Sequence, residues 1–331
     1  MDVTVAEPRV ADKRLQQWLY QAPASQGALL WRLLHLRAVL ALSVPTIAGA
    51  MLGWWQTGAV DGVRLFLLFS STFCLILGIH LLNDNRDYHY ALKSNDVKFT
   101  PEIFATTYHL LAAGQLQSYQ VSSLAHSLLV YSTLAHFGLF LLVSWPVLFF
   151  YTISLLFMYT YATPPIRYGY RGWGLGEIGV LLGYGIFPLI GSYFIVSESI
   201  GWLPVWVSLP FGLLVVLSFL THNLVHYRRD WLMRKRTLVV SLGPLRTFDV
   251  GSVLTILIYA ALLAIASLAH LPLSTLVTLA VLPLALGGFS RLRQEQPHLE
   301  DVFRLHLTTL NVTMWTGLLF CAALLADKAF S

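Results

Sequence analysis

The sequence contains few charged residues. Only 11% of its 331 residues are Asp, Glu, Lys or Arg, whereas an ordinary soluble domain has about 25%. A hydrophobic fraction of 56% and a mean hydropathy of +0.67 accompany this shortage. A chain with so little charge cannot cover itself with a solvated surface, which excludes an ordinary soluble domain. We therefore expect an all-α, polytopic membrane protein.

Cysteine is also scarce, and several common motifs are missing. Cys74 and Cys321 both lie in apolar runs, which predicts buried thiols and excludes a disulfide framework or a cysteine-rich metal site. The sequence has no Walker A loop, no Rossmann glycine fingerprint and no His-Glu-x-x-His element. The net charge of +5 is explained by membrane topology and anionic headgroups. No nucleic-acid partner is expected.

Nine apolar stretches have about the 20 residues that the hydrocarbon core of a bilayer requires. They cover residues 33–55, 62–83, 121–143, 146–163, 174–196, 202–225, 249–269, 272–290 and 304–326. The segment before them lacks the basic start and apolar core of a signal peptide. We therefore divide the chain into a cytoplasmic N-terminal tail, residues 1–32, and a nine-helix transmembrane domain, residues 33–331.

The basic residues predict the orientation. If the N-terminus is inside, the tail and the loops after the even-numbered spans contain every Lys and Arg except Arg64 and Lys328. Such a bias is the positive-inside pattern of integral membrane proteins. It predicts an inner (cytoplasmic) membrane protein whose two longest loops, residues 84–120 and 226–248, lie on the cytoplasmic face. We expect the functional residues there.

The end of the second span carries a polar cluster. Asn83, Asp84 and Asp87 are spaced three and four apart, so on a helix they share one face. Carboxylate and amide oxygens are the ligands that Mg²⁺ prefers. The cluster is therefore a candidate half of a metal site, and the alternative is a solvated helix cap.

A second polar cluster follows the sixth span. Asn223, His226 and Asp230 are again at helical spacing, and a basic run follows them. A diphosphate chelated by Mg²⁺ needs carboxylates on the metal and cations on its remaining oxygens. Lys235 and Arg236 would supply those cations, with Arg228 or Arg229 as further candidates. The alternative is that the basic run only anchors the helix on the inside.

Together these residues resemble a known superfamily. The motif Asn83-Asp84-Asn85-Arg86-Asp87, the segment from Asn223 to Asp230 and the sequence Lys235-Arg236-Thr237-Leu238 resemble those of the UbiA-type intramembrane prenyltransferases. The branch most similar to this chain prenylates 1,4-dihydroxy-2-naphthoate in menaquinone synthesis. Further matches are Leu36-Arg37, Pro164-Pro165 with Tyr168, and Gly174-Leu175-Gly176-Glu177.

The resemblance implies a helical bundle around a central cavity, where Mg²⁺ and basic residues ionise an isoprenyl diphosphate and an aromatic, quinone-like acceptor attacks it. It implies Asn83, Asp84, Asp87 and Asp230 as metal ligands, of which the three Asp residues, with Lys235, would be catalytic. The implied diphosphate contacts are Asn83, Arg86, Asn223, Arg228, Arg234, Lys235 and Arg236. The implied acceptor contacts are His80, Tyr168, Glu177, His222 and His226. Glu177 could instead cap a helix N-terminus.

Four positions depart from the family pattern. His226 stands where an Asp is usual, Arg234 where a Gly is usual, His109 where an Arg is common and Ala91 where a carboxylate is common. Imidazole is a poor ligand for Mg²⁺ but acceptable to Mn²⁺, which makes Mn²⁺ a second candidate cofactor. These departures leave three hypotheses open. The chain is a prenyltransferase, a related terpene cyclase, or a catalytically silent protein that binds prenyl lipid or quinone or joins a membrane complex.

Overall fold

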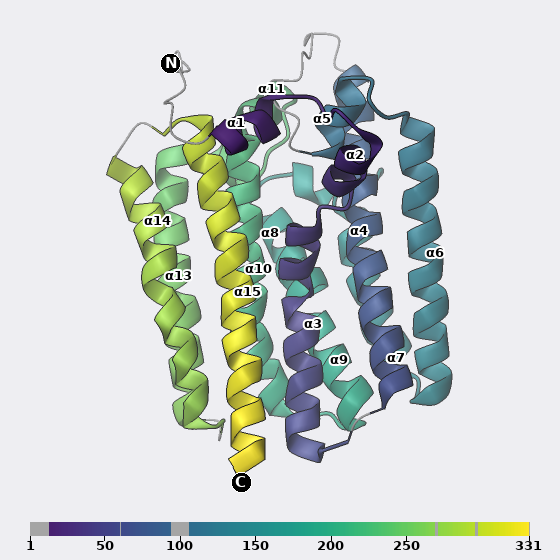
Figure 1. Cartoon of the computed structure of the whole chain (residues 1–331), viewed down its shortest axis with the longest axis vertical. Coiled ribbons are helices and arrows are strands. Elements are labelled where there is room, and N and C mark those ends of the chain that lie inside the picture. Colours follow the sequence, from purple (N-terminus) through teal and green to yellow (C-terminus); the bar gives the residue numbers. More distant parts are fainter. Residues whose placement is uncertain (1–12, 60, 94–105, 269–270, 295–296, 331) are drawn as a thin grey trace.

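The computed structural model describes residues 13–59, 61–93, 106–268, 271–294 and 297–330. Within these ranges the chain is helical, apart from turns and one isolated bridge between Arg171 and Arg236. The long helices run side by side along one axis (Figure 1). Asp96, a carboxylate of the first long loop, lies outside the described residues.

Each predicted span falls on one helix or on two or three consecutive helical elements. Seven are single helices: α3 (Leu36–Thr57), α4 (Gly62–Lys93), α6 (Ser118–Leu142), α7 (Pro146–Thr160), α10 (Trp202–Val225), α13 (Pro244–Leu268) and α15 (Leu299–Phe330). The fifth span consists of α8 (Leu175–Val180), a π-helical turn η2 (Leu181–Ile186) and α9 (Phe187–Ser197). The eighth consists of η3 (Leu273–Val281) and α14 (Leu282–Gln294). Within the described residues, eight helical segments are long and apolar enough to cross a membrane, whereas α7 has 15 residues.

The second span differs from its prediction in a way that matters for the site. We expected it to end at residue 83, but α4 continues for ten more residues to Lys93. Asp84, Asn85 and Asp87 are buried on this extension. A continuous helix with buried carboxylates excludes the solvated cap, because a cap would leave these side chains in water. The polar motif is instead built into the bundle.

Small residues allow the helices to approach closely. A Cβ atom on Gly185 of η2 would overlap the backbone of Gly212 on α10, and one on Gly49 of α3 would overlap the backbone of Leu189 on α9. In lipid, helices associate through such van der Waals packing because the surrounding tails are as apolar as the side chains. Two further glycines of the fifth span are also closely packed: Gly179 lies against Tyr168, and Gly183 against Phe157.

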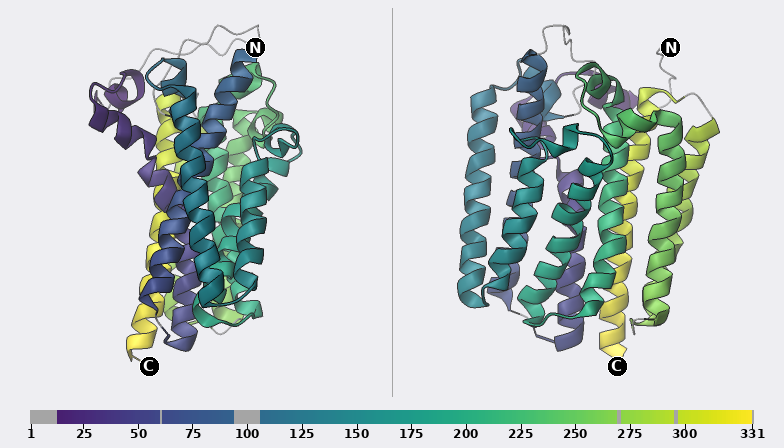
Figure 2. Two further views of the ribbon diagram at one scale, coloured as in Figure 1. Left: turned by 90° about the vertical axis from the view of Figure 1, so that its right-hand side faces the viewer. Right: turned by 180° about the vertical axis from the view of Figure 1, so that it is seen from behind.

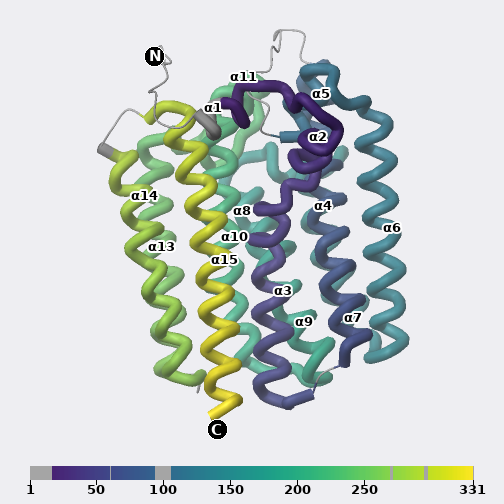
Figure 3. Tube along the Cα trace, viewed as in Figure 1, coloured from purple at the N-terminus to yellow at the C-terminus, as the bar shows by residue number. Residues whose placement is uncertain are grey.

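The short helices collect at one end of the bundle. Figure 1 and the trace in Figure 3 show α1 (Lys13–Tyr20), α2 (Gln26–Leu33), α5 (Thr107–Ala112) and α11 (Tyr227–Leu232) at the end opposite the C-terminus of α15. The two rotated views in Figure 2 confirm this separation. Helices α1 and α2 belong to the predicted tail. This end of the bundle contains both predicted polar clusters.

Candidate active site

The two predicted polar clusters meet in a buried charge network. Asp87 comes from α4, Asp230 from α11, and Lys235 from the turn after α11. Nζ of Lys235 donates to Oδ2 of Asp87 at 3.0 Å and lies 4.0 Å from Oδ2 of Asp230. Asp87 and Lys235 are each 4% exposed and Asp230 is 0% exposed. The two clusters therefore face each other, as the sequence predicted.

Arg229 is the second cation of this network. Its Nη2 atom donates to Oδ2 of Asp87 at 3.2 Å and to Oδ1 of Asp230 at 3.0 Å. Its guanidinium carbon lies 4.5 Å from the ring centroid of Tyr108. Arg228, which we had favoured, is exposed. Adjacent residues on a helix point about 100° apart, so only one of two consecutive arginines can face the network.

Aromatic side chains complete the network. The hydroxyl of Tyr170, in the 3₁₀ turn η1 (Tyr168–Tyr170), donates to Oδ1 of Asp87. Nζ of Lys235 lies 4.8 Å from the ring centroid of Tyr170 and 5.9 Å from that of Tyr161. Burial alone would lower the pKa of Lys235, but the carboxylates of Asp230 and Asp87 hold that pKa above its ordinary value. Lys235 therefore stays charged although it is buried.

Several oxygens beside the network suit a hard cation. Oδ1 of Asn83 and Oδ2 of Asp230 are buried and have no hydrogen-bond partner within the described residues. Buried polar atoms are almost always paired, so such orphaned acceptors indicate a missing donor or ion. Asp84 adds a buried carboxylate, one oxygen of which accepts from the backbone N–H of Tyr108 at 3.2 Å. Asn83, Asp84 and Asp230 thus offer oxygen atoms of the kind that a divalent cation takes as ligands, whereas both oxygens of Asp87 are already hydrogen-bonded.

Four predicted diphosphate contacts lie away from the network. Arg86 donates to the hydroxyl of Tyr159 at 3.2 Å and lies over that ring. Arg228, Arg234 and Arg236 are exposed. Arg234 has φ +56°, in the left-handed region that glycine adopts at no steric cost. The backbone of this turn explains why Gly is usual at position 234, and the arginine there points to the surface.

The predicted acceptor contacts separate into two places. His80, His222 and His226 line one cavity, described below. The Tyr168 hydroxyl donates to the carbonyl oxygen of Phe157. Oε1 of Glu177 accepts from the backbone N–H of Leu238, the first residue of α12 (Leu238–Leu242), at 3.4 Å. Asn223 interacts with Glu177 through its side chain. Glu177 therefore caps a helix, although a different one from the helix on which it lies.

Imidazoles line a cavity at the same end of the bundle as the network. We call it the histidine cavity: a space of about 400 Å³ bordered by five histidines, which come from the start of α3, from α4, α10 and α15 and from the turn after α10, together with Arg32, Arg37 and apolar side chains. The ring centroids of successive histidines are 4.6–5.9 Å apart. The five are His35, His80, His222, His226 and His306. Sequence reasoning assigned no role to His35 or His306, because they are 271 positions apart and share no motif.

Two of the departures from the family pattern are in contact. The ring centroids of His109, on α5, and His226 are 5.4 Å apart. Burial lowers the pKa of His109 to about 3, and the Arg229 charge adds to this effect. Burial and the same charge lower the pKa of His226 well below its ordinary value. Both rings are therefore neutral at physiological pH. Ala91, the fourth departure, is buried against Tyr108 and Met233.

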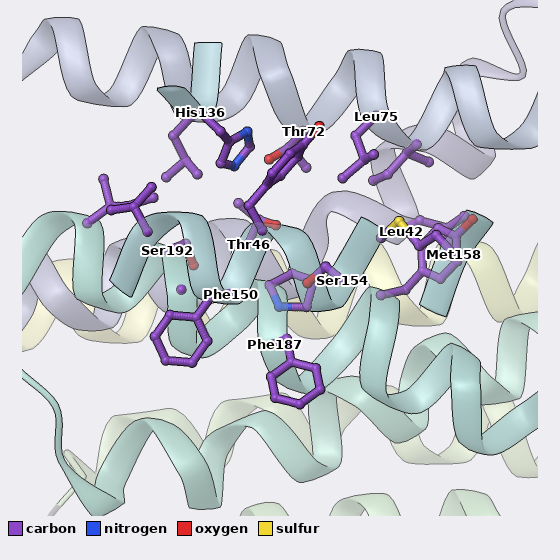
Figure 4. A pocket seen from close by; sticks show the side chains of 18 residues that line it. Leu42, Thr46, Thr72, Leu75, His136, Phe150, Ser154, Met158, Phe187 and Ser192 are labelled. Atoms are coloured by element: carbon purple, nitrogen blue, oxygen red, sulfur yellow. The ribbon is translucent and has the colours of Figure 1, made fainter. Parts of the chain in front are cut away.

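A second, smaller cavity lies deeper in the bundle. It has a volume of about 40 Å³ and is lined mainly by apolar and aromatic side chains, with His136, Thr46, Thr72, Ser154 and Ser192 among them, as Figure 4 shows. Leu42 of α3 borders both this space and the histidine cavity. Leu42 is therefore part of the wall of both cavities.

The network predicts unequal roles for two adjacent cations. We expect Lys235→Met to lower the free energy of unfolding by about 3–5 kcal/mol, because it leaves two buried carboxylates with a single cation. Arg236→Met removes an exposed charge, so it should change stability by less than about 0.5 kcal/mol. Thermal unfolding in detergent micelles measures both. Equal losses in the two variants would contradict the network.

The sequence and the fold resemble those of known proteins. The chain is 25% identical over 287 residues to the 2-carboxy-1,4-naphthoquinone phytyltransferase of Synechocystis sp., covering 84% of this chain and 87% of the relative. It is 26% identical over 205 residues to the 1,4-dihydroxy-2-naphthoate octaprenyltransferase of Mycobacterium leprae, covering 61% and 65%. A UbiA homolog from Archaeoglobus fulgidus, bound to GPP and Mg²⁺, superposes with a TM-score of 0.63 at 15% identity, covering 90% of this chain and 98% of that one. Residues 42–315 match the UbiA prenyltransferase family, and the chain therefore belongs to that family.

Proposed function

We propose that this protein is a membrane prenyltransferase that transfers an isoprenyl group from a prenyl diphosphate to an aromatic, quinone-precursor-like acceptor. The observation that carries the proposal is the buried network of Asp87, Asp230, Arg229 and Lys235, which lies at the same end of the bundle as a cavity of about 400 Å³. Buried ionisable groups in a membrane protein are costly and mark functional sites. A donor with a charged head and an apolar tail suits a polar network within an apolar bundle.

The positive and negative charges of the network balance one another. Binding of the prenyl diphosphate would give each of these charged side chains a new partner. Two carboxylates and two cations neutralise one another. A diphosphate would draw Lys235 and Arg229 onto its oxygens, where charge accumulates as the leaving group departs. Asp87 and Asp230 would then be free for a cation. This exchange of partners keeps every buried charge paired and so avoids the large free-energy cost of burying an unpaired charge.

A divalent cation fits the oxygens that the network leaves unsatisfied. Asn83, Asp84 and Asp230 would hold it, joined by Asp87 once Lys235 and Arg229 move to the diphosphate. When bound, Mg²⁺ would neutralise charge on the leaving diphosphate. The all-oxygen donor set favours Mg²⁺, while His226, which contacts other histidines, leaves Mn²⁺ as an alternative.

The histidine cavity is the proposed acceptor site. The aromatic ring would form a carbon–carbon bond to the allylic carbon as the bond from that carbon to the diphosphate oxygen breaks, and the ring would then lose a proton. His80, His222 and His226 would receive the acceptor, because a neutral imidazole can accept a hydrogen bond from a ring hydroxyl. The naphthoquinone and dihydroxynaphthoate in the relatives' names support a bicyclic aromatic acceptor.

We further propose that nine helices span an inner (cytoplasmic) membrane with the N-terminus and the charge network on the cytoplasmic side. The N-terminal helices α1 and α2 and the C-terminus of α15 lie at opposite ends of the bundle, which requires an odd number of crossings. The ninth span would be α7, which has 15 residues. At the end that contains the C-terminus, Arg64 is paired with Glu198 and Asp61, so this end carries little unbalanced positive charge.

The orientation predicts opposite labelling of two loops. With Cys74 and Cys321 replaced by Ser, Arg234→Cys should react with a membrane-impermeant maleimide only in inside-out vesicles. Ser199→Cys, in the exposed turn before α10, should react only in right-side-out vesicles. Labelling of both positions from the same side would contradict a crossing by α10, and the reversed pattern would contradict the proposed orientation.

The network predicts which carboxylate is required for turnover. With Mg²⁺, a prenyl diphosphate and a dihydroxynaphthoate, the protein should release diphosphate and form a prenylated ring. Asp87→Asn should reduce this rate by at least about 100-fold. Asp249→Asn, which removes an exposed carboxylate paired with Arg293, should leave it unchanged. No turnover with any donor would favour the silent lipid-binding alternative, and diphosphate release without ring prenylation would indicate a terpene cyclase.

The proposed acceptor site predicts a selective change in KM. His222→Ala should raise KM for the aromatic acceptor about tenfold, because one hydrogen bond in a buried site is lost. KM for the prenyl diphosphate should change little. His126→Ala, an exposed histidine on α6, is the matched control. Steady-state kinetics with each substrate varied in turn separates the two constants. A rise confined to the donor KM would place the acceptor elsewhere.

A further inference from the structure

A second set of metal ligands lies at the edge of the histidine cavity. One ring nitrogen of His35, one of His80 and a carboxylate oxygen of Asp84 lie within 4.8 Å of one another. His80 and Asp84 are four residues apart on α4, so they share one face of that helix. His35 comes from the junction of α2 and α3, with its ring centroid 4.7 Å from that of His80. We propose that these three side chains bind a divalent transition-metal ion.

The first turn of α5 holds two of the three ligands in place. The Thr107 hydroxyl is hydrogen-bonded to Nε2 of His35 at 3.1 Å. The next backbone N–H, from Tyr108, donates to Oδ2 of Asp84 at 3.2 Å. Metal-binding histidines and carboxylates are characteristically oriented by such outer hydrogen bonds. If Nε2 of His35 carries the proton, Nδ1 keeps a lone pair for the ion.

The backbone at His35 also fixes its ring. His35 precedes α3 with φ 44° and ψ 36°, in the left-handed region that residues other than glycine rarely adopt. Such a conformation persists only where the surrounding structure enforces it, and it is common at functional sites. Here it directs the side chain toward α4 and α5, where it meets His80 and Thr107.

The donor set selects a different metal from the one proposed for the diphosphate. Two imidazoles and one carboxylate suit Zn²⁺, Mn²⁺, Fe²⁺ or Co²⁺, whereas Mg²⁺ takes oxygen ligands. Three protein ligands leave coordination positions open, as in catalytic rather than structural zinc sites. His35 and His80 both border the histidine cavity, so a molecule bound there would lie close to the ion.

The net charge of the proposed metal site indicates which kind of group would act as a further ligand to the ion. A divalent ion with Asp84 alone keeps a net positive charge, because Asp87 and Asp230 are already paired with Arg229 and Lys235. An anionic oxygen from a ligand in the histidine cavity, such as a phenolate or a carboxylate, would balance it. Asp84 is shared with the oxygen ligands proposed for Mg²⁺, so it would bridge the two ions or bind one of them at a time. Binding of the transition metal does not itself require prenyl transfer.

Cobalt binding tests the site directly. Full-length protein in detergent, stripped of metal with a chelator, is titrated with Co²⁺ and followed by its visible absorption. We expect a spectrum distinct from that of aqueous Co²⁺ and suppressed by added Zn²⁺ but not by Mg²⁺. His35→Ala and His80→Ala should each weaken Co²⁺ binding by at least about tenfold, and Thr107→Val, which keeps the side-chain shape, should weaken it less.

Matched controls separate this site from the charge network. His126→Ala removes an exposed histidine and should bind Co²⁺ like the unaltered protein. Asp87→Asn should retain Co²⁺ binding even though it is expected to lose prenyl transfer, so the two proposals can fail independently. Thermal unfolding shows whether each variant is folded. A cobalt spectrum identical to that of the aqueous ion, or equal affinity in folded His35→Ala and His80→Ala variants, would overturn the proposal.

Discussion

The contact that joins the two halves of the site is the buried interaction of Asp87 with Lys235 and Arg229. It connects α4 to the segment after α10, which are separated by more than a hundred residues in the chain. In a low-dielectric interior an unpaired charge would be expensive, so each of these side chains depends on the others. Tyr170 brings η1 into the same network. One set of charges therefore fixes the relative positions of three segments.

Helix α5, which contacts the network through Tyr108, has a comparable organising role. Its first turn contacts His35 through Thr107 and Asp84 through the backbone of Tyr108, and His109 reaches His226. These contacts tie a six-residue helix to α3, α4 and the turn after α10. The substitutions at positions 109 and 226 are thus one local change, in which two neutral rings pack together beside Arg229.

Much of this architecture could be predicted from the sequence because the governing signals are local. Apolar run length gave nine ranges that each fall on one helix or on two or three consecutive helical elements, and helical spacing identified Asp84, Asp87 and Asp230. The extension of α4 was missed, because polarity after Asn83 was taken to end the span. Polarity does not end a helix whose carboxylates are buried against other segments.

The remaining features depend on contacts between distant segments. Nothing near Tyr170 in the chain indicates that its hydroxyl reaches Asp87, and His35 and His306 share no motif. The choice between Arg228 and Arg229 depends on which face of α11 points inward. The sequence alone left that direction open. Arg234 was predicted to contact the diphosphate because the sequence shows its charge. The sequence does not show that residue 234 has a left-handed backbone conformation.

Leu42 lines both the histidine cavity and the smaller cavity. We expect a smaller residue at this position to enlarge the space open to a ligand, and a larger one to reduce it. Neither change touches the charge network at the end of α4. The length of ligand that the bundle accommodates and the chemistry at its charged end could therefore evolve independently, through different residues.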